Sequence, residues 1–307
     1  MKNNAVFNKN TYVTIELAKI FIATPVGQRI QTFTELVEIF KVSRGTVQNS
    51  MDSLIEAGAI TLTSKGFLGT FLVKKNIDLL LEKALIKGLI GVMPLPYSRR
   101  YEGLATGIIS EMENEHNIQV NMAYMRGAKK RIEMVLSGRY DFAIISRYAA
   151  YQALADFKQL KIVKDFGERS YLDSHVLLFN DKSKLEVEDG MRVGIDIDSI
   201  DQENLTKLIC QDKRVEYLKL GYNQIIDKLL SNEIDVAVWN KDELRIQEEK
   251  IHTVSITVMD NLDDTVAVIV IDSTRVELEF LIGERIDVSH VLEVQQLVIE
   301  DKIVPSY

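Results

Sequence analysis

The sequence predicts an α/β protein with two parts: a small N-terminal unit of short helices and a β-hairpin, and a larger α/β domain of two lobes. Two capped helices and paired apolar strands occupy residues 31–73. From residue 89 onward, segments with strand and helix patterns alternate. One helix, turn and strand pattern recurs at a constant offset of 94 residues, which indicates two related lobes. We therefore expect residues 1–75 to form the first part, 76–88 a linking helix and 89–307 the two lobes.

Local capping signals define the two short helices. Thr32 and Glu35 can form a capping box, so the first helix should begin at Phe33. Ser43 is a suitable N-cap for the second helix, and Gly58 should end it because glycine readily adopts the left-handed conformation that follows many helices. Apolar spacing then predicts the core positions of this part, which are Leu36, Val37, Phe40, Val47, Met51, Leu54, Ile55, Ile60, Leu62, Phe71 and Val73.

Polar side chains should face outward from the second helix. Two helices followed by a hairpin form a winged helix-turn-helix, which most often places its second helix in the major groove of DNA. We therefore expect a double-stranded DNA operator as a partner. The candidate contacts are the N-cap and outward residues of this helix and the loop of the hairpin, namely Ser43, Arg44, Thr46, Gln48, Asn49, Lys65 and Gly66.

Charge divides along the same boundary. Residues 1–75 contain nine Lys and Arg and five Asp and Glu, so their net charge is +4, whereas the rest of the chain carries −12. Phosphate contacts supply much of the affinity of DNA-binding proteins. A basic first part on an acidic chain therefore favours DNA binding through that part, and the acidic remainder should stay off the duplex.

The winged helix resembles that of the GntR family of bacterial transcription regulators. The matching motifs are Val42–Val47, Leu54–Ile60 and, less completely, Gly66–Phe71. The resemblance implies that Arg44 and Thr46 touch DNA, and that Lys65 and Gly66 lie along the minor groove or the backbone. GntR-family proteins usually carry arginine where this chain has Gln48, and glutamine pairs better with adenine. We therefore expect either weaker contacts with phosphate and guanine or a base preference that differs from that of its arginine-bearing relatives.

Composition excludes several classes of protein. The chain of 307 residues is 46% hydrophobic and 27% charged, as expected of a globular protein with two or three domains. It starts without an apolar signal segment, and charges interrupt its most apolar stretch, residues 79–92, so we expect a cytoplasmic protein without a membrane anchor. The single cysteine, Cys210, cannot form an internal disulfide, and the four histidines lack metal-ligand spacing. We therefore expect no metal, no cofactor and no catalytic residues.

The repeat predicts two lobes with a ligand between them. Residues 127–144 align with residues 221–238, and in both a helix and a tight turn lead to Asp141 or Asp235 at the start of a buried strand. The phrase Leu-Ser-Gly-x-x-Asp-Phe-Ala-Ile also resembles the hinged lobes of periplasmic-binding-protein-like sensor domains. This resemblance implies a ligand between the lobes, at the carboxyl ends of the strands.

Polar groups follow the strands that should meet at this place. Tyr97 and Ser98 lie where a strand leads into a helix, and helix N-termini bind anions. Arg126 and Arg147 follow the next two strands and could bind a carboxylate, phosphate or phosphonate, although each could as well pair with a surface acid. Asp196, Tyr222 and Asn240 of the second lobe could bind an amino group or hydroxyl groups of the ligand. The candidate ligand residues are Tyr97, Ser98, Arg126, Gly127, Ser146, Arg147, Asp196, Tyr222 and Asn240.

Motifs along the whole chain resemble the YhfZ type of GntR-related regulator, which joins a winged helix to a binding-protein-like domain. They are Met93–Ala105, Met125–Ala128, Asp141–Ala149, Val238–Asn240 and Pro305–Tyr307. We therefore interpret the chain as a ligand-responsive transcription regulator that senses a small anionic or zwitterionic metabolite and binds DNA as a homodimer. Two alternatives stay open: an enzyme of unknown reaction on the same fold, and an architectural DNA-binding protein without an effector.

Overall fold

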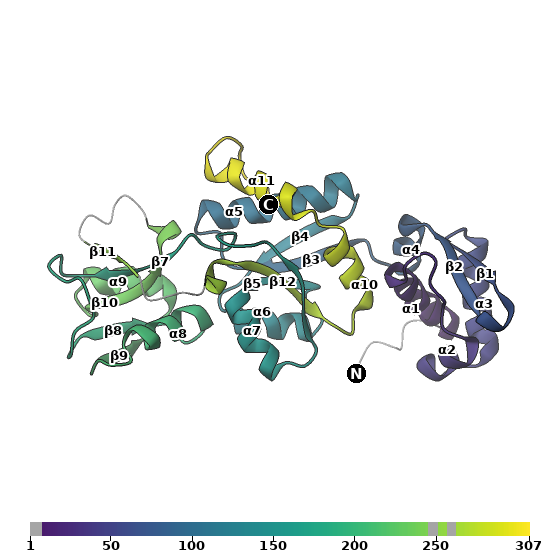
Figure 1. Cartoon of the computed structure of the whole chain (residues 1–307), viewed down its shortest axis with the longest axis horizontal. Helices are drawn as coiled ribbons and strands as arrows, with labels where there is room; N and C mark the ends of the chain where they lie inside the picture. Colours follow the sequence, from purple (N-terminus) through teal and green to yellow (C-terminus); the bar gives the residue numbers. More distant parts are fainter. Residues whose placement is uncertain (1–7, 245–250, 257–261) are drawn as a thin grey trace. The chain divides into compact units, whose positions relative to one another are not determined.

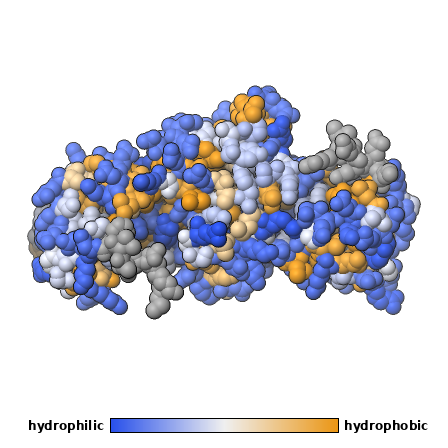
Figure 2. All heavy atoms as spheres, turned by 180° about the vertical axis from the view of Figure 1, so that it is seen from behind, coloured by the Kyte–Doolittle hydropathy of each residue, from blue (hydrophilic) through white to orange (hydrophobic). Residues whose placement is uncertain are grey.

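The computed structural model describes residues 8–244, 251–256 and 262–307. The chain forms two compact units, which are Met1–Leu89 with Thr274–Arg285, and Ile90–Ser273 with Ile286–Tyr307 (Figure 1). No helix within the described ranges is long and apolar enough to cross a membrane. The face drawn in Figure 2 is mainly hydrophilic, with hydrophobic residues in separate patches.

The first unit contains the predicted helix-turn-helix and hairpin. Its elements are α1 (Lys9–Ala23), α2 (Phe33–Phe40), α3 (Arg44–Glu56), β1 (Ile60–Ser64), β2 (Thr70–Lys75) and α4 (Ile77–Lys83). α1 packs on α3 and α4, and β1 pairs antiparallel with β2. Fully buried side chains such as Phe21, Leu36 and Leu54 form the core. Burying each of these contributes roughly 1.5–3 kcal/mol, so packing fixes α3 while its polar residues stay outside.

The structure confirms the local capping signals. α2 begins at Phe33 behind a complete capping box of Thr32 and Glu35. α3 begins after Ser43, whose hydroxyl accepts a hydrogen bond from the backbone N–H of Thr46 at 3.2 Å. Gly58 follows the helix with a φ of 71°, which explains the need for glycine there.

Two predicted core positions in this unit are wrong. Ile55 is 41% exposed, because Ser50 takes part in the buried face of α3 and donates its hydroxyl to the carbonyl of Asn10 at 3.1 Å. Val73 is also exposed, and Leu72 is buried in its place. The register shifts between Thr61 and Leu62, and a shift of one residue moves side chains to the opposite face of a strand.

A late segment of the chain joins the first unit. After β12 (Ala267–Asp272), the single turn α10 (Val276–Leu278) packs against α1, and so does the following π-helical turn Glu279–Glu284. The Lys75 ammonium lies 4.0 Å from the ring centroid of Phe280. The sequence predicts residues 89–307 as the second part, and no local pattern near residue 280 indicates this return to the first unit.

The second unit contains two five-stranded sheets (Figure 1). In the first lobe the strand order is β4 (Gln119–Tyr124), β3 (Gly88–Met93), β5 (Phe142–Ser146), β12 and β6 (Leu160–Asp165). The helices of this lobe are α5 (Arg99–Ser110, continued by the π-helical turn Glu111–Glu115), α6 (Ala128–Leu136), α7 (Arg147–Asp156) and α11 (Val288–Ile299). β12 runs antiparallel to both of its neighbours, so the sheet is mixed.

The second lobe repeats this arrangement. Its strand order is β9 (Glu216–Lys219), β8 (Arg192–Ile195), β10 (Val236–Asn240), β7 (His175–Phe179) and β11 (His252–Ser255), with helices α8 (Ile200–Ile209) and α9 (Ile225–Leu230). β7 takes the antiparallel place that β12 has in the first lobe. β5 and β10 begin 94 residues apart, at Phe142 and Val236. The repeat in the sequence therefore corresponds to equivalent strands of the two lobes.

Candidate functional site

The exposed face of α3 carries the predicted DNA contacts. Arg44, Gln48 and Asn49 are exposed, and Thr46 is half-buried. The guanidinium of Arg44 lies 5.7 Å from the ring centroid of Phe33, and it forms no ion pair with any described residue. The amide of Gln48 donates to the carboxylate of Asp52 at 3.1 Å. α3 therefore presents an unneutralised cation and adaptable polar groups, as base reading requires.

Ser43 and Asn49 have additional structural contacts. The hydroxyl of Ser43 caps α3 and lies 2.9 Å from the hydroxyl of Thr46. Asn49 borders a groove that is also lined by Asn10 and Thr14 of α1. Both residues are exposed, as are Arg44 and Gln48 on the same helix.

The loop of the hairpin combines a cation with exposed apolar side chains. Lys65 lies with its ammonium 4.5 Å from the ring centroid of Phe71 and makes no ion pair in the described parts of the chain. Gly66 has a φ of 59°, and Phe67 after it is 100% exposed. The tip of the wing is thus free to meet another surface.

A cavity of about 100 Å³ lies between the two lobes of the second unit. Its lining includes six of the predicted ligand residues, which are Tyr97, Arg126, Gly127, Asp196, Tyr222 and Asn240. They come from the ends of strands in both lobes, where the sequence places them. The carboxyl ends of the strands therefore do meet at one cavity.

Arg126 bridges the two lobes. Its guanidinium donates to the carboxylate of Asp196 at 2.8 Å and to the side-chain oxygen of Asn223 at 2.9 Å. The side chain of Asp196 is only 5% exposed and also accepts the backbone N–H of Tyr222 at 3.0 Å. Gly127 follows with a φ of 80°, and a Cβ there would lie 2.9 Å from the carbonyl oxygen of Asp198. Glycine therefore allows the backbones of the two lobes to approach closely.

Three predicted ligand residues lie outside this lining. Ser98 is buried and caps α5 by accepting the N–H of Tyr101. Ser146 caps α7 and donates its hydroxyl to the carboxylate of Asp201 at 2.7 Å. The Arg147 guanidinium donates to Asp263 at 2.7 Å and to Asp165 at 3.0 Å, so it pairs with acids as its alternative interpretation allows. Neither of these two acids lines the cavity.

The cavity also contains residues that sequence reasoning missed. Arg131, on the second turn of α6, is 3% exposed; it donates to the carbonyl of Met125 at 2.8 Å and to the hydroxyl of Tyr171 at 3.1 Å. Its Nε has no hydrogen-bond partner among the described residues. The other missed residues with polar side chains are Tyr101, Tyr171, His175, Ser199, Asp201, Gln202 and Glu243. The position of Arg131 four residues after Gly127 was the one available signal, since it places the side chain one turn from the start of α6.

Removal from water shifts the acidity of groups in the cavity. Desolvation raises the pKa of Asp201 to about 6, although the Ser146 hydroxyl and the charges of His175 and Arg131 act in the opposite direction. Burial likewise raises the pKa of Tyr171 to about 12. The ring of Tyr222 stacks on Trp239 with centroids 4.1 Å apart, and its hydroxyl accepts the N–H of Asn240 at 3.0 Å. The cavity therefore has a rigid aromatic wall beside charged groups.

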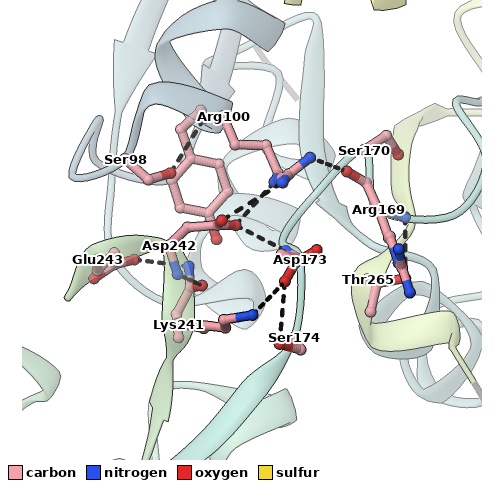
Figure 3. Close-up of polar contacts among 12 residues, drawn as sticks. Ser98, Arg100, Arg169, Ser170, Asp173, Ser174, Lys241, Asp242, Glu243 and Thr265 are labelled. Atoms are coloured by element: carbon pink, nitrogen blue, oxygen red, sulfur yellow. Dashed lines mark hydrogen bonds and ion pairs between the residues drawn. The ribbon is translucent and has the colours of Figure 1, made fainter. Parts of the chain in front are cut away.

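A second group of polar contacts joins the lobes beside the cavity (Figure 3). Arg100 of α5 donates through Nε to the carboxylate of Asp242 at 2.8 Å, and Asp242 also accepts the N–H of Asp173 at 2.7 Å. Lys241 reaches the carboxylate of Asp173 at 3.2 Å. These contacts connect α5 of the first lobe, the crossing segment before β7 and the turn after β10. Within the described residues, no group of three or more His, Cys, Asp or Glu side chains is placed to hold a metal ion.

The comparisons with known proteins identify the family. Residues 76–307 match the family described as the YhfZ C-terminal domain, and residues 25–72 match a helix-turn-helix domain family. The chain belongs to the YhfZ family. The uncharacterized protein YhfZ of Escherichia coli K12 is 30% identical over 305 residues, which cover 97% of this chain and 98% of that protein. A helix-turn-helix joined to a YhfZ C-terminal domain indicates a DNA-binding regulator.

Solved structures support the fold of the second unit. The crystal structure of YhfZ from Shigella flexneri is 31% identical, with a TM-score of 0.63, and the match covers 75% of this chain and 97% of that one. The periplasmic aliphatic sulphonate binding protein SsuA of Escherichia coli is 12% identical with a TM-score of 0.53, covering 69% of this chain and 74% of its own. The YhfZ domain thus has the fold of periplasmic binding proteins, as the resemblance implied.

Proposed function

We propose that this YhfZ-family protein is a cytoplasmic transcription regulator with a GntR-type winged helix, and that it binds its operator through α3 and the hairpin loop. The observation that carries this proposal is the exposed Arg44 at the start of α3, which has no carboxylate partner in the described chain. Ser43, Thr46, Gln48 and Asn49 complete the face, and Lys65 and Gly66 contact the backbone or minor groove.

The protein acts as a homodimer in this proposal. One short recognition helix has too few contacts for specific binding by itself, whereas a two-fold dimer reads two half-sites about one helical turn, roughly 34 Å, apart. Closure of the two lobes on a ligand alters the separation of the recognition helices and so changes operator affinity. A ligand can shift this equilibrium only by its differential affinity for the two states.

The proposed effector is a small anionic or zwitterionic metabolite bound in the cavity between the lobes. The support is chemical: the cavity is concave, is lined from both lobes, and holds arginine, carboxylate and tyrosine side chains within one small volume. Tyr97, Arg126, Gly127, Asp196, Tyr222 and Asn240 are the proposed contacts, and Ser98, Ser146 and Arg147 position the helices and loops around them.

Selection of genomic DNA fragments with the purified full chain tests this function. We expect enrichment of a few sites, a two-fold symmetric footprint on each, and a dimer at micromolar concentration by light scattering. Failure to enrich any sequence would exclude specific DNA binding. A monomer that protects one asymmetric half-site would exclude the dimer while leaving DNA binding intact.

An enzyme is the second candidate, and one observation favours it. Nδ1 of His175, which lines the cavity, lies 2.7 Å from the carboxylate of Asp264, and such a pair can orient an imidazole as a general base. The test is to incubate the protein with a compound that raises its melting temperature and to measure how much of that compound is recovered. Recovery unchanged supports a sensor, turnover supports an enzyme, and operator binding without any stabilising compound supports an architectural role.

A further inference from the structure

Arg131 is a buried cation that lines the cavity between the lobes and forms no ion pair with a described side chain. Its side chain is 3% exposed, forms no ion pair within the described residues, and is held by two neutral acceptors, the carbonyl of Met125 and the hydroxyl of Tyr171. Its Nε lacks a hydrogen-bond partner in the same part of the chain. Burying an arginine without a carboxylate is costly unless something else supplies the missing partner.

Asp201 is the matching acid in the same cavity. It accepts hydrogen bonds from the hydroxyl of Ser146 at 2.7 and 2.8 Å, and it forms no ion pair with a described side chain. Arg131 and Asp201 line the same cavity, and no hydrogen bond or ion pair joins their described side chains. The cavity is therefore lined by one positive and one negative group that form no ion pair with a described side chain.

The other charged groups of the lining are already engaged. Arg126 binds Asp196, and His175 binds Asp264. Glu243 accepts the side-chain amide of Asn240 at 3.1 Å. Three carboxylates in one small cavity, at Asp196, Asp201 and Glu243, disfavour a ligand that carries negative charge alone, because like charges repel in a site shielded from water.

We propose that the cleft binds a small amino acid, whose carboxylate accepts hydrogen bonds from Arg131 and whose ammonium donates to Asp201. The cavity of about 100 Å³ suits a ligand of few heavy atoms, and Tyr97, Tyr101 and Tyr171 add aromatic side chains to its lining. This inference rests on the proposed function and specifies its ligand. It assigns the ligand carboxylate to Arg131, whereas Arg126, which also lines the cavity, already donates to Asp196 and Asn223.

The first test is a thermal-shift screen of the full chain with the standard amino acids, β-alanine and 4-aminobutyrate. We expect at least one of them to raise the melting temperature, because a ligand that binds only the native state stabilises it. The deaminated acid and the decarboxylated amine of the best binder should each bind at least about tenfold more weakly by calorimetry, a loss of about 1.4 kcal/mol. No stabilisation by any amino acid, or equally tight binding of the deaminated acid, overturns the proposal.

Two variants assign the two ends of the ligand. Arg131→Gln should weaken the amino acid and its deaminated analogue by about tenfold or more and leave the amine unchanged. Asp201→Asn, which keeps an acceptor for Ser146, should weaken the amino acid and the amine and spare the deaminated acid. Arg214→Gln is the matched control, since Arg214 is exposed and pairs with Asp189 at the surface. If either cavity variant folds and binds all three probes like the control, its assigned contact is wrong.

Operator binding separates this inference from the proposed function. Suppose that a phosphate or a plain carboxylic acid changes the affinity of the protein for its operator and that no amino acid does. The proposed regulator function then stands, and the amino acid proposal fails. If an amino acid binds with the predicted pattern and the protein enriches no DNA sequence, the ligand assignment stands and the regulator fails.

Discussion

Two cations of the first unit and two of the second unit differ in whether they form ion pairs. In the first unit, Arg44 and Lys65 lie over aromatic rings and form no ion pairs within the described residues. In the second unit, Arg126 and Arg147 are neutralised by Asp196, Asp165 and Asp263. A cation that must meet phosphate has to remain unpaired, whereas a cation that joins elements of a fold has to find its acid. We therefore expect the pairing state of a cation to separate the proposed DNA contacts of the first unit from the arginines that join elements of the second.

Arg44→Ala should give the largest change in binding. The variant loses a candidate base contact of α3, so operator affinity should fall by roughly 1–3 kcal/mol. Its free energy of unfolding should stay within about 0.5 kcal/mol of that of wild type, because no ion pair or buried contact is lost. Fluorescence anisotropy with operator DNA and urea unfolding measure the two quantities.

Arg214→Ala is the matched control for that experiment, since it removes an exposed arginine of the acidic unit. Unchanged operator affinity is expected for this variant. Equal losses in the two variants would show that overall charge, rather than the position of Arg44, determines DNA affinity.

Arg126→Ala should show the reverse pattern. It leaves the carboxylate of Asp196, which is 5% exposed, without its cation, so the free energy of unfolding should fall by about 1–3 kcal/mol. Ligand-free operator affinity should not change, because Arg126 belongs to the second unit. Urea unfolding compares this variant with Arg214→Ala, whose exposed pair should contribute about 0–1 kcal/mol. If Arg126→Ala is as stable as the control, the bridge to Asp196 contributes little to holding the lobes together.

Asp201 extends the comparison to acids, because it is a carboxylate without a cation. Its pKa is raised from 3.8 to about 6 by desolvation, so the native state holds a proton that the unfolded chain has released. The stabilising contribution is present below about pH 4 and is lost as pH rises through about 6. Wild type should therefore lose stability relative to Asp201→Asn across this range, by about 2–3 kcal/mol. If the free energies of unfolding of wild type and Asp201→Asn change equally from pH 4 to 7, the pKa of Asp201 is not raised in the native state.

Local features of the fold could be predicted from sequence because they depend on neighbouring residues. The capping box of Thr32 and Glu35, the cap at Ser43 and the glycine at 58 each act within four residues, and all three are present in the structure. The repeat likewise places β5 and β10 at equivalent positions, since both strands follow the same helix and turn. The positions of Arg126 and Asn240 in the cavity lining could be predicted in the same way, because each lies at the end of a strand.

The rest depends on contacts between distant residues. Arg131 bonds to Tyr171, 40 residues later, and Arg126 bonds to Asp196, 70 residues later, so neither the unpaired nor the paired arginine can be recognised from its own surroundings. The antiparallel strands β7 and β12 follow the segments where the chain crosses between lobes, and a buried apolar run does not reveal strand direction. Thr274–Arg285 belongs to the first unit through contacts with residues far away in the sequence, so this too could not be predicted from local patterns.

Lys65→Ala should give the smallest effect and the sharpest distinction within the first unit. Lys65 carries a point charge in an exposed loop, so it should contact phosphate rather than a base edge. Removing one phosphate contact lowers the slope of log affinity against log salt concentration by about 1 and weakens binding evenly across DNA sequences. Arg44→Ala should instead relax sequence preference, because a bidentate arginine discriminates between bases. Titrations at several salt concentrations, on operator and on scrambled DNA, separate the two roles. An unchanged salt slope for Lys65→Ala would show that Lys65 in the wing does not contact phosphate. The proposed DNA interface would then consist of α3, with Arg44 as its unpaired cation.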